Sequence, residues 1–338
     1  MPLRPFAKAA LALLNVSAFV LAASGMAGAA DNKTSYWPGP VLTAEAKSKF
    51  LCESVPDRIF VPSPSGSECV SYFVTSGNED QSKAVFFFNG DMPPLANASE
   101  FAAHMERSQA TIERLMQKYA DKFHVRYVYV SRLGLQGSSG DHKKRSSPHE
   151  TEVMYAATQM LMKQLGIDTI ALSGQSRGST ISASLLTMRL PGVTCAALGS
   201  GAFNIVDLEY EHLSQGHPSV SKAVLAKQIY NPAAHVDSID VNPDRRIFVL
   251  GDRRDTRAYY PQQLDFVNSL NAAGHHAVTL GITASDSEHH GAARYTIPTA
   301  GACLTGMSDD QIIRAVAHMQ PKGDAPLTIN AVRLDLDD

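Results

Sequence analysis

The sequence predicts an α/β protein in which helices cover both faces of a mostly parallel sheet of about eight strands. Short apolar segments alternate with segments of helical periodicity through most of the 338 residues, which is typical of a parallel sheet. Residues 84–88 are apolar at every position, as expected for a strand buried on both faces. Two extended segments nearer the N-terminus, joined by a Pro-Ser-Gly-Ser turn, predict an antiparallel hairpin at one edge.

The expected elements follow in chain order. Apolar and β-branched runs predict strands at 57–62, 69–75, 84–88, 125–130, 168–173, 194–198, 247–250 and 277–282. Helical spacing predicts helices at 99–119, 153–165, 179–188 and 261–273, and a capping box at 308–311 opens another. The stretch 200–243, after the sixth strand, is irregular with two short helices. We expect it to form a small lid-like insertion.

Residues 1–30 have the layout of a secretory signal peptide. Arg4 and Lys8 precede an apolar run, and small residues follow up to Ala29 and Ala30, near which cleavage is expected. The apolar run is shorter than the ~20 residues of a membrane-spanning helix, so no stable membrane span is expected after cleavage. These features predict a periplasmic or secreted protein.

The remaining chain is expected to form a single domain over residues 31–322, followed by a C-terminal tail at 323–338. The sequence has 30 Lys and Arg against 33 Asp and Glu, a net charge of −3, and loss of the two basic residues of the signal peptide makes it −5. No basic stripe or tract is present. Nucleic acid and anionic membranes are therefore not expected as partners.

Four cysteines in an exported chain predict two disulfides. Cys52 and Cys69 flank one short extended segment and form the simplest local pair. Cys195 and Cys303 would then link the C-terminal part of the chain to the sheet. The spacing does not fix this connectivity, and four unpaired thiols are the alternative.

The segment 174–178, Gly-Gln-Ser-Arg-Gly, predicts a nucleophilic serine. It follows an apolar strand and opens a helix rich in small residues. A sharp strand-to-helix turn needs glycine on both sides of Ser176, because side chains there would clash with neighbouring elements. Such a turn exposes the serine hydroxyl at the carboxyl end of the sheet and directs helix N-terminal amides at the same point. The alternative is a turn that only connects two elements.

A serine hydroxyl needs a base and an orienting acid, and both are predicted after later strands. Asp255 is the favoured acid, because a few residues after the strand allow its loop to turn toward the imidazole. Asp252 is an alternate that could pair with an adjacent arginine, and Asp207 is a third candidate.

The base is expected in the segment Glu-His-His-Gly at 288–291. His290 is favoured over His289, because Gly291 would leave room for the His290 ring beside the nucleophile. Adjacent histidines cannot easily share one metal ion, so no metal site is predicted there.

An oxyanion hole needs two backbone amides that point at the developing negative charge. The amide of Arg177 follows the nucleophile and supplies one. The loop 89–91, after the third strand, is expected to supply the other through the amide of Asp91. The alternative for this loop is a plain turn.

The order of these segments resembles the α/β-hydrolase superfamily across nearly the whole mature chain. Residues 131–140, Ser-Arg-Leu-Gly-Leu-Gln-Gly-Ser-Ser-Gly, are similar to the Arg-Gly, Gly-Ser loop of prolyl-oligopeptidase-like hydrolases. Asn231-Pro232 and the segment leading to Gly251 resemble that family's approach to its acid. The resemblance implies an α/β-hydrolase fold and a serine esterase or peptidase, with Asn89 in place of the histidine of the usual His-Gly oxyanion motif.

The combined prediction is an exported serine hydrolase that cleaves an ester or amide through an acyl-enzyme and needs no cofactor. A small-molecule ester or a peptide is the expected substrate, with short or medium acyl chains favoured. A prolyl-oligopeptidase-type peptidase, an acyltransferase and a non-catalytic binding protein are the alternatives. Four arginines either make the rim basic and favour acidic substrates or pair with the nearby aspartates: Arg177, Arg253, Arg254 and Arg257.

Overall fold

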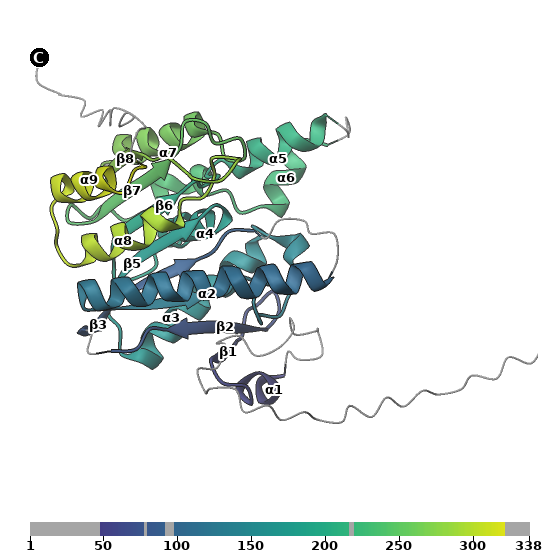
Figure 1. The fold of residues 1–338 in the computed structure, drawn as a ribbon. Helices are drawn as coiled ribbons and strands as arrows, with labels where there is room; N and C mark the ends of the chain where they lie inside the picture. The colour runs from purple at the N-terminus through teal and green to yellow at the C-terminus, as the bar shows by residue number, and fades with distance from the viewer. Residues whose placement is uncertain (1–47, 78–79, 92–97, 216–219, 322–338) are drawn as a thin grey trace, which may run out of the picture. The chain divides into compact units, whose positions relative to one another are not determined.

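The computed structural model describes residues 48–77, 80–91, 98–215 and 220–321 (Figure 1). All of them belong to one compact unit, Ser35–Asp338. The predicted signal peptide at 1–30 and the predicted tail at 323–338 lie outside the described residues. The boundaries of the expected domain therefore stay a prediction.

Within the described part of the chain, eight strands form one sheet in the order β1-β2-β4-β3-β5-β6-β7-β8 (Figure 1). β1 pairs antiparallel with β2, β2 pairs antiparallel with β4, and all other neighbours are parallel. The fold class and the N-terminal hairpin are thus confirmed. The strands are β1 (Arg58–Val61), β2 (Glu68–Val74), β3 (Asp80–Phe88), β4 (Val125–Val130), β5 (Thr169–Gln175), β6 (Val193–Gly199), β7 (Arg246–Gly251) and β8 (His276–Gly281).

Helices cover both faces of the sheet. Buried side chains of α3, α4 and α7 pack on one face, and those of α2, α8 and α9 pack on the other. The helices are α1 (Lys49–Glu53), α2 (Ala98–Phe123), α3 (Pro148–Leu165), α4 (Arg177–Thr187), α5 (Ile205–Ser214), α6 (Lys222–Gln228), α7 (Tyr260–Ala272), α8 (Ala293–Leu304) and α9 (Asp309–His318), with 3-10 turns η2 (His142–Lys144) and η3 (Pro232–Ser238).

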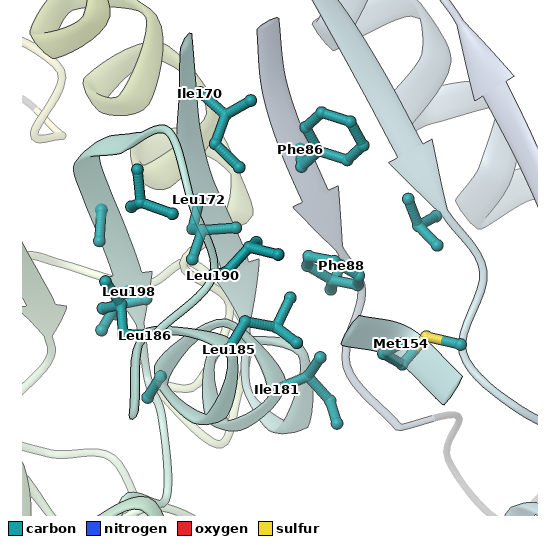
Figure 2. Close-up of a cluster of buried hydrophobic side chains, with 14 of the residues drawn as sticks. Phe86, Phe88, Met154, Ile170, Leu172, Ile181, Leu185, Leu186, Leu190 and Leu198 are labelled. Atoms are coloured by element: carbon teal, nitrogen blue, oxygen red, sulfur yellow. The ribbon is translucent and has the colours of Figure 1, made fainter. Parts of the chain in front are cut away.

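Helices on both faces of the sheet explain the unbroken apolar sequence of residues 84–88, the second half of β3. Successive side chains of a strand point to opposite faces. Phe86 and Phe88 accordingly pack among the side chains of α3 and α4 (Figure 2), whereas Val85 and Phe87 pack on the other face. All four are fully buried. Residues 84–88 are buried on both faces and are all apolar, whereas the polar residues 80–83 of the same strand are exposed or partly exposed.

Helix α8 was absent from the sequence-based prediction. Pro298 lies inside it, and proline disfavours a helix interior. The helix nevertheless forms because its residues from Tyr295 to Leu304 are all buried against the sheet. A Cβ at Gly301 would lie only 2.0 Å from the hydroxyl of Tyr127, so a small residue is needed for this close packing. Tertiary burial therefore outweighs local propensity here.

Both expected disulfides are present. Cys52 is bonded to Cys69, which ties α1 to β2, and Cys195 is bonded to Cys303, which ties β6 to α8. The second disulfide spans 108 residues of sequence and does link the C-terminal part of the chain to the sheet.

The insertion between β6 and β7 consists of α5, α6 and η3, in agreement with the two short helices expected there. Helices α5 and α6 pack against each other (Figure 1). None of the helices in the described ranges has the length and apolar character that a membrane span requires.

Candidate active site

Ser176 occupies a strained turn between β5 and α4. Its φ of 55° and ψ of −125° lie outside the regions favoured by residues with a side chain. A Cβ at Gly174 would lie 2.5 Å from the carbonyl oxygen of Gly178, and a Cβ at Gly178 would lie 2.0 Å from that of Phe88. Both glycines are therefore required by close backbone contacts, as the motif predicted. The amide of Ser176 donates to the carbonyl of Gly199 on β6, which anchors the turn to the sheet.

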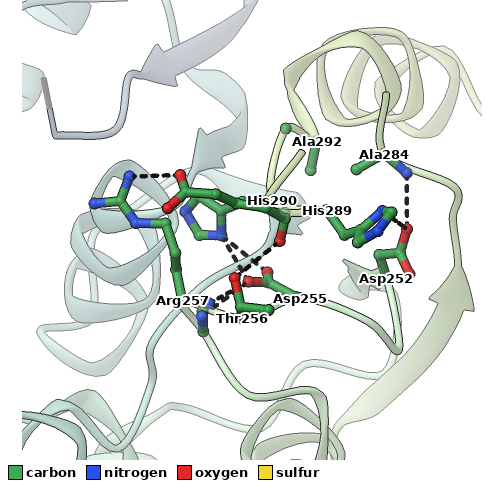
Figure 3. A network of polar contacts seen from close by, with 12 residues as sticks. Asp252, Asp255, Thr256, Arg257, Ala284, His289, His290 and Ala292 are labelled. Carbon is green, nitrogen blue, oxygen red and sulfur yellow. Dashed lines mark hydrogen bonds and ion pairs between the residues drawn. The ribbon is translucent and has the colours of Figure 1, made fainter. Parts of the chain in front are cut away.

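The structure brings His290 and Asp255 together (Figure 3). The Nδ1 atom of His290 lies 3.0 Å from Oδ1 and 2.9 Å from Oδ2 of Asp255. Oδ1 also accepts hydrogen bonds from the amides of Arg257 and Ala258. Both side chains are buried, and Nε2 of His290 has no hydrogen-bond partner among the described residues. The imidazole thus presents one nitrogen to the carboxylate and keeps the other available.

The alternate acids have other partners. Asp252 accepts two hydrogen bonds from the Arg254 guanidinium and one from the Ala284 amide. The arginine pairing expected for Asp252 is therefore present. Asp207 lies in the first turn of α5, 2.8 Å from Nζ of Lys222.

The side chain of the alternate base, His289, points away from the Asp255 carboxylate and toward Asp252 (Figure 3). Its Nδ1 is 3.8 Å from Oδ2 of Asp252, and its φ of 55° is left-handed. The structure thus pairs the two histidines with two different aspartates, His290 with Asp255 at hydrogen-bonding distance and His289 with Asp252 more loosely.

Asp286 holds the loop that carries His290. Its carboxylate accepts hydrogen bonds from the amides of Glu288, His290 and Gly291. Burial by itself raises the pKa of Asp286, but the amides of His290 and Gly291 outweigh it and hold the pKa below its usual value. A Cβ at Gly291 would lie 2.7 Å from Oδ2 of Asp286, so the glycine makes room for this carboxylate. That it also leaves room for the His290 ring stays a prediction.

Gln175 joins the serine turn to the histidine loop, a contact that was not predicted from the sequence. Its Nε2 donates to the carbonyl of His290 at 3.0 Å, and its Oε1 accepts from the amide of Ala292 at 2.5 Å. Since Gln175 directly precedes Ser176, these bonds bring the loop of His290 to the nucleophile. Ser176 Oγ and His290 Nε2 are not hydrogen-bonded to each other, which is common before substrate binds.

The loop after β3 passes directly beside Ser176. A Cβ at Gly90 would lie 2.9 Å from Cβ of Ser176. In the described chain, no hydrogen bond engages the amide of Asp91 or that of Arg177, which opens α4. Whether these two amides form the expected oxyanion hole stays a prediction.

The side chain of Asp91 lies among basic groups. Its carboxylate is 2.7 Å from Arg132, 3.0 Å from Arg145 and 3.6 Å from Arg177. Burial raises the pKa of Asp91, but Arg132 and Arg177 outweigh it and hold the pKa below the ordinary value. Nε2 of His142 lies 3.5 Å from Oδ1 of Asp91, the oxygen that Arg132 also contacts. These ion pairs therefore fix the loop that passes beside Ser176.

Arg132 comes from the segment that resembles the prolyl-oligopeptidase-like loop, and it is buried behind Asp91. Its guanidinium also donates to both oxygens of Glu150 at the start of α3. Burial lowers the pKa of Arg132, but Glu150 and Asp91 outweigh it and raise the pKa above its usual value. The positive charge of Arg132 is thus paired with the negative charges of Asp91 and Glu150.

The four arginines considered for the rim are engaged in contacts. Arg177 pairs with Glu209 of α5 as well as with Asp91. Arg254 pairs with Asp252, Arg257 pairs with Glu288, and Arg253 lies over the ring of Tyr260. The pairing with Asp252 was expected, whereas Arg257 pairs with a glutamate and offers Asp255 only its amide. In the described ranges, no three His, Cys, Asp or Glu side chains are arranged to hold a metal ion.

Known proteins resemble this chain in structure but not in sequence. No protein-family model matches it, and no curated protein matches its sequence. Est1E from Butyrivibrio proteoclasticus is 10% identical and superposes with a TM-score of 0.52 over 74% of this chain and 98% of Est1E. Est1E with ferulic acid bound gives 11% identity and a TM-score of 0.53 over 75% of this chain and 99% of Est1E.

A third solved structure, the acylaminoacyl peptidase of Pyrococcus horikoshii, is 13% identical with a TM-score of 0.50. The match covers 72% of this chain and 39% of the peptidase. These similarities show that the chain has the α/β-hydrolase fold, as the resemblance in its sequence indicated. At these identities they show the fold alone.

Proposed function

We propose that this protein is a serine hydrolase that cleaves small esters, with Ser176 as nucleophile, His290 as base and Asp255 as the orienting acid. The observation that carries this proposal is the pairing of His290 with Asp255 on a loop that Gln175 joins to the serine turn. The two available amides beside the serine support it further. A non-catalytic binding protein would have no need of this combination.

The hydrogen bonds of Asp255 favour the protonation state of His290 that catalysis requires. A carboxylate only accepts hydrogen bonds, so Nδ1 of His290 carries its proton and donates it to Asp255. In the neutral imidazole, Nε2 is then the unprotonated nitrogen and can accept the hydroxyl proton of Ser176. The amides of Arg257 and Ala258 fix the carboxylate in turn, which limits the freedom of the imidazole.

The proposed reaction has two halves. Oγ of Ser176 attacks the ester carbonyl carbon while Nε2 of His290 takes its proton, and the amides of Asp91 and Arg177 donate to the resulting oxyanion. Collapse breaks the bond to the leaving alcohol, which takes the proton from His290. Water then attacks the acyl-enzyme with the same assistance from His290, and this step releases the acid and restores Ser176.

Esters with small or medium acyl groups are the proposed substrates. The insertion between β6 and β7 is short, and α5 contributes Glu209 to the charged groups around Arg177. The match to Est1E extends over nearly all of that protein, and one of its structures holds ferulic acid. This favours an esterase over a peptidase, since the match to the peptidase spans a minor part of it.

We also propose that the protein is exported, on the basis of the signal-like residues 1–30. The two disulfides support an oxidising compartment, because such bonds rarely persist in a reducing cytosol.

The test uses p-nitrophenyl esters of increasing acyl length. Wild-type protein should hydrolyse the acetate and butyrate faster than the longest chains, and Ser176→Ala should abolish hydrolysis. Ser65→Ala is a matched control, because Ser65 is another serine with a histidine at hydrogen-bonding distance. Its Oγ lies 2.7 Å from Nδ1 of His149, and Nε2 of that ring lies 3.1 Å from Glu68.

Ser65 differs from Ser176 in that its hydroxyl also hydrogen-bonds to Glu152, and it precedes no helix. Ser65→Ala should therefore retain wild-type rates. Loss of activity in Ser65→Ala with retention in Ser176→Ala would refute the assignment of the nucleophile.

A further inference from the structure

Gln175 makes two hydrogen bonds that its place in the chain does not require. Its Nε2 donates to the carbonyl of His290, and its Oε1 accepts from the amide of Ala292. The two bonds span the residues on either side of Gly291, so one side-chain amide holds two adjacent backbone groups of a loop that is more than 100 residues away in sequence. Both polar atoms of the side chain are satisfied in this one orientation.

The backbone of His290 is fixed by side chains at both its polar groups. Its carbonyl accepts from Gln175, and its amide donates to Oδ1 of Asp286 at 3.0 Å. The imidazole is then held by Asp255. Asp286 belongs to the histidine loop itself and Asp255 to the loop after β7. Among these three contacts, the one from Gln175 connects His290 to the element that carries Ser176.

Gln175 is rigidly placed relative to the nucleophile. It is the last residue of β5, and the next residue is Ser176, whose amide is bonded to the carbonyl of Gly199. Any displacement of the histidine loop relative to β5 must therefore stretch the two bonds of Gln175. A displacement of about 1 Å between a base and a nucleophile can lower the rate on the order of 100-fold.

We infer that Gln175 is a positioning residue, which sets the separation of Ser176 and His290 by bonding the histidine loop to the end of β5. This inference rests on the proposed function. Gln175 donates no proton to substrate and takes none. Its effect reaches the reaction through the position of His290, so its loss should lower kcat and kcat/KM together and leave KM little changed.

Two substitutions separate positioning from general stability. Gln175→Met keeps the length of the side chain and removes both hydrogen bonds, so kcat should fall about 10- to 100-fold at every pH. Gln175→Glu keeps an acceptor for the Ala292 amide but, when ionised, sets a carboxylate oxygen against the carbonyl of His290. Once protonated, the same side chain can donate to that carbonyl and restore the second bond.

The pH dependence is therefore the decisive readout. The kcat of Gln175→Glu, divided by that of wild type at each pH, should rise as the pH falls from 8 to 5, while the ratio for Gln175→Met stays flat. Dividing by wild type removes the titration of groups that all the proteins share. A role in stability alone would change the melting temperature and the amount of active protein but would give both variants flat ratios.

Gln164→Met is the matched control, since Gln164 is exposed on α3 and, among the residues that the structure describes, its side chain donates to the hydroxyl of Tyr72 alone. It should keep the wild-type kcat. If wild-type protein hydrolyses the esters and Gln175→Met does so within twofold of it, or if the ratio for Gln175→Glu is flat with pH, the inference is wrong and the proposed function stands. If wild type hydrolyses no ester and does not react through Ser176, the proposed function fails and the inference fails with it.

Discussion

Replacing Asp255 by asparagine should nearly abolish catalysis while leaving the fold intact. The reason lies in which oxygen of the carboxylate holds which partner. Oδ1 accepts from the amides of Arg257 and Ala258 at 2.8 and 2.9 Å and also lies 3.0 Å from Nδ1 of His290, whereas Oδ2 lies 2.9 Å from the same Nδ1. The two amides demand an acceptor, so the oxygen of the asparagine must take the Oδ1 position and its NH₂ group must face the imidazole.

The asparagine NH₂ is a donor, so it forces the wrong tautomer on His290. Nδ1 must then accept, and the proton moves to Nε2, where it blocks uptake of the proton of Ser176. A tautomer change of this kind lowers kcat by about 10⁴-fold in a serine protease, which corresponds to about 5.5 kcal/mol of barrier. Stability should change by only about 2 kcal/mol, because the bonds from both amides survive and one charge-assisted bond is replaced.

The assay compares kcat for p-nitrophenyl acetate in wild type, Asp255→Asn and Asp252→Asn, with unfolding in urea measured for each. Asp252 serves as the control because it binds Arg254 and Ala284 rather than His290. Its asparagine variant should keep a kcat close to wild type. A folded Asp255→Asn protein with kcat within about tenfold of wild type would refute the tautomer argument.

Three further predictions follow from the packing and charges around the site. Gly178→Ala should destabilise the protein and lower its activity, because the new Cβ would lie 2.0 Å from the carbonyl oxygen of Phe88. Helix propensity alone would instead stabilise the protein by about 1 kcal/mol. A variant that is more stable than wild type in urea unfolding would therefore contradict the steric argument. Replacing Cys195 and Cys303 together by alanine should lower the free energy of unfolding by about 4 kcal/mol, since the disulfide closes a loop of 108 residues; an unchanged urea midpoint would count against this. The pKa of Asp286 is lowered in the folded protein, so its stabilising effect is present above the unfolded value of 3.8 and is lost as the pH falls through the folded pKa. The stability difference between wild type and Asp286→Asn should therefore be constant above about pH 5 and shrink at lower pH, and a constant difference down to pH 3 would be inconsistent with it.

Much of the fold could be predicted from the sequence because burial on both faces of the sheet leaves an unbroken apolar pattern, as in residues 84–88 of β3. Helix α8 could not be predicted in the same way. Pro298 and Gly301 are poor helix residues, and the helix forms because the sheet buries it. Information on such burial lies in distant parts of the chain and not in the local pattern.

The candidate site residues could be predicted from the sequence, but the contacts that hold them in place could not. The glycines around Ser176 are dictated by the turn itself, so the motif identifies the serine. The choice of Asp255 over Asp252 rested on loop length, and in the structure Arg254 engages Asp252.

The residues that hold the site in place act through long-range contacts, which sequence spacing cannot show. Gln175 meets the backbone of residues 290–292 across more than 100 residues of sequence. The close approach of the Asp286 carboxylate to Gly291 arises only in the folded loop. The ion pairs of Asp91 with Arg132, Arg145 and Arg177 likewise join three separate segments.

The central claim is that Ser176 is an activated nucleophile, and labelling by a fluorophosphonate probe tests it most directly. Trypsin releases Ser176 on the peptide 164–177, which also contains Ser173, and fragmentation of that peptide locates the adduct. We predict stoichiometric modification of Ser176 in the folded protein, slower labelling in His290→Ala, and none after heat denaturation. Folded protein that stays unlabelled at Ser176, or that is labelled at another serine, would contradict the account.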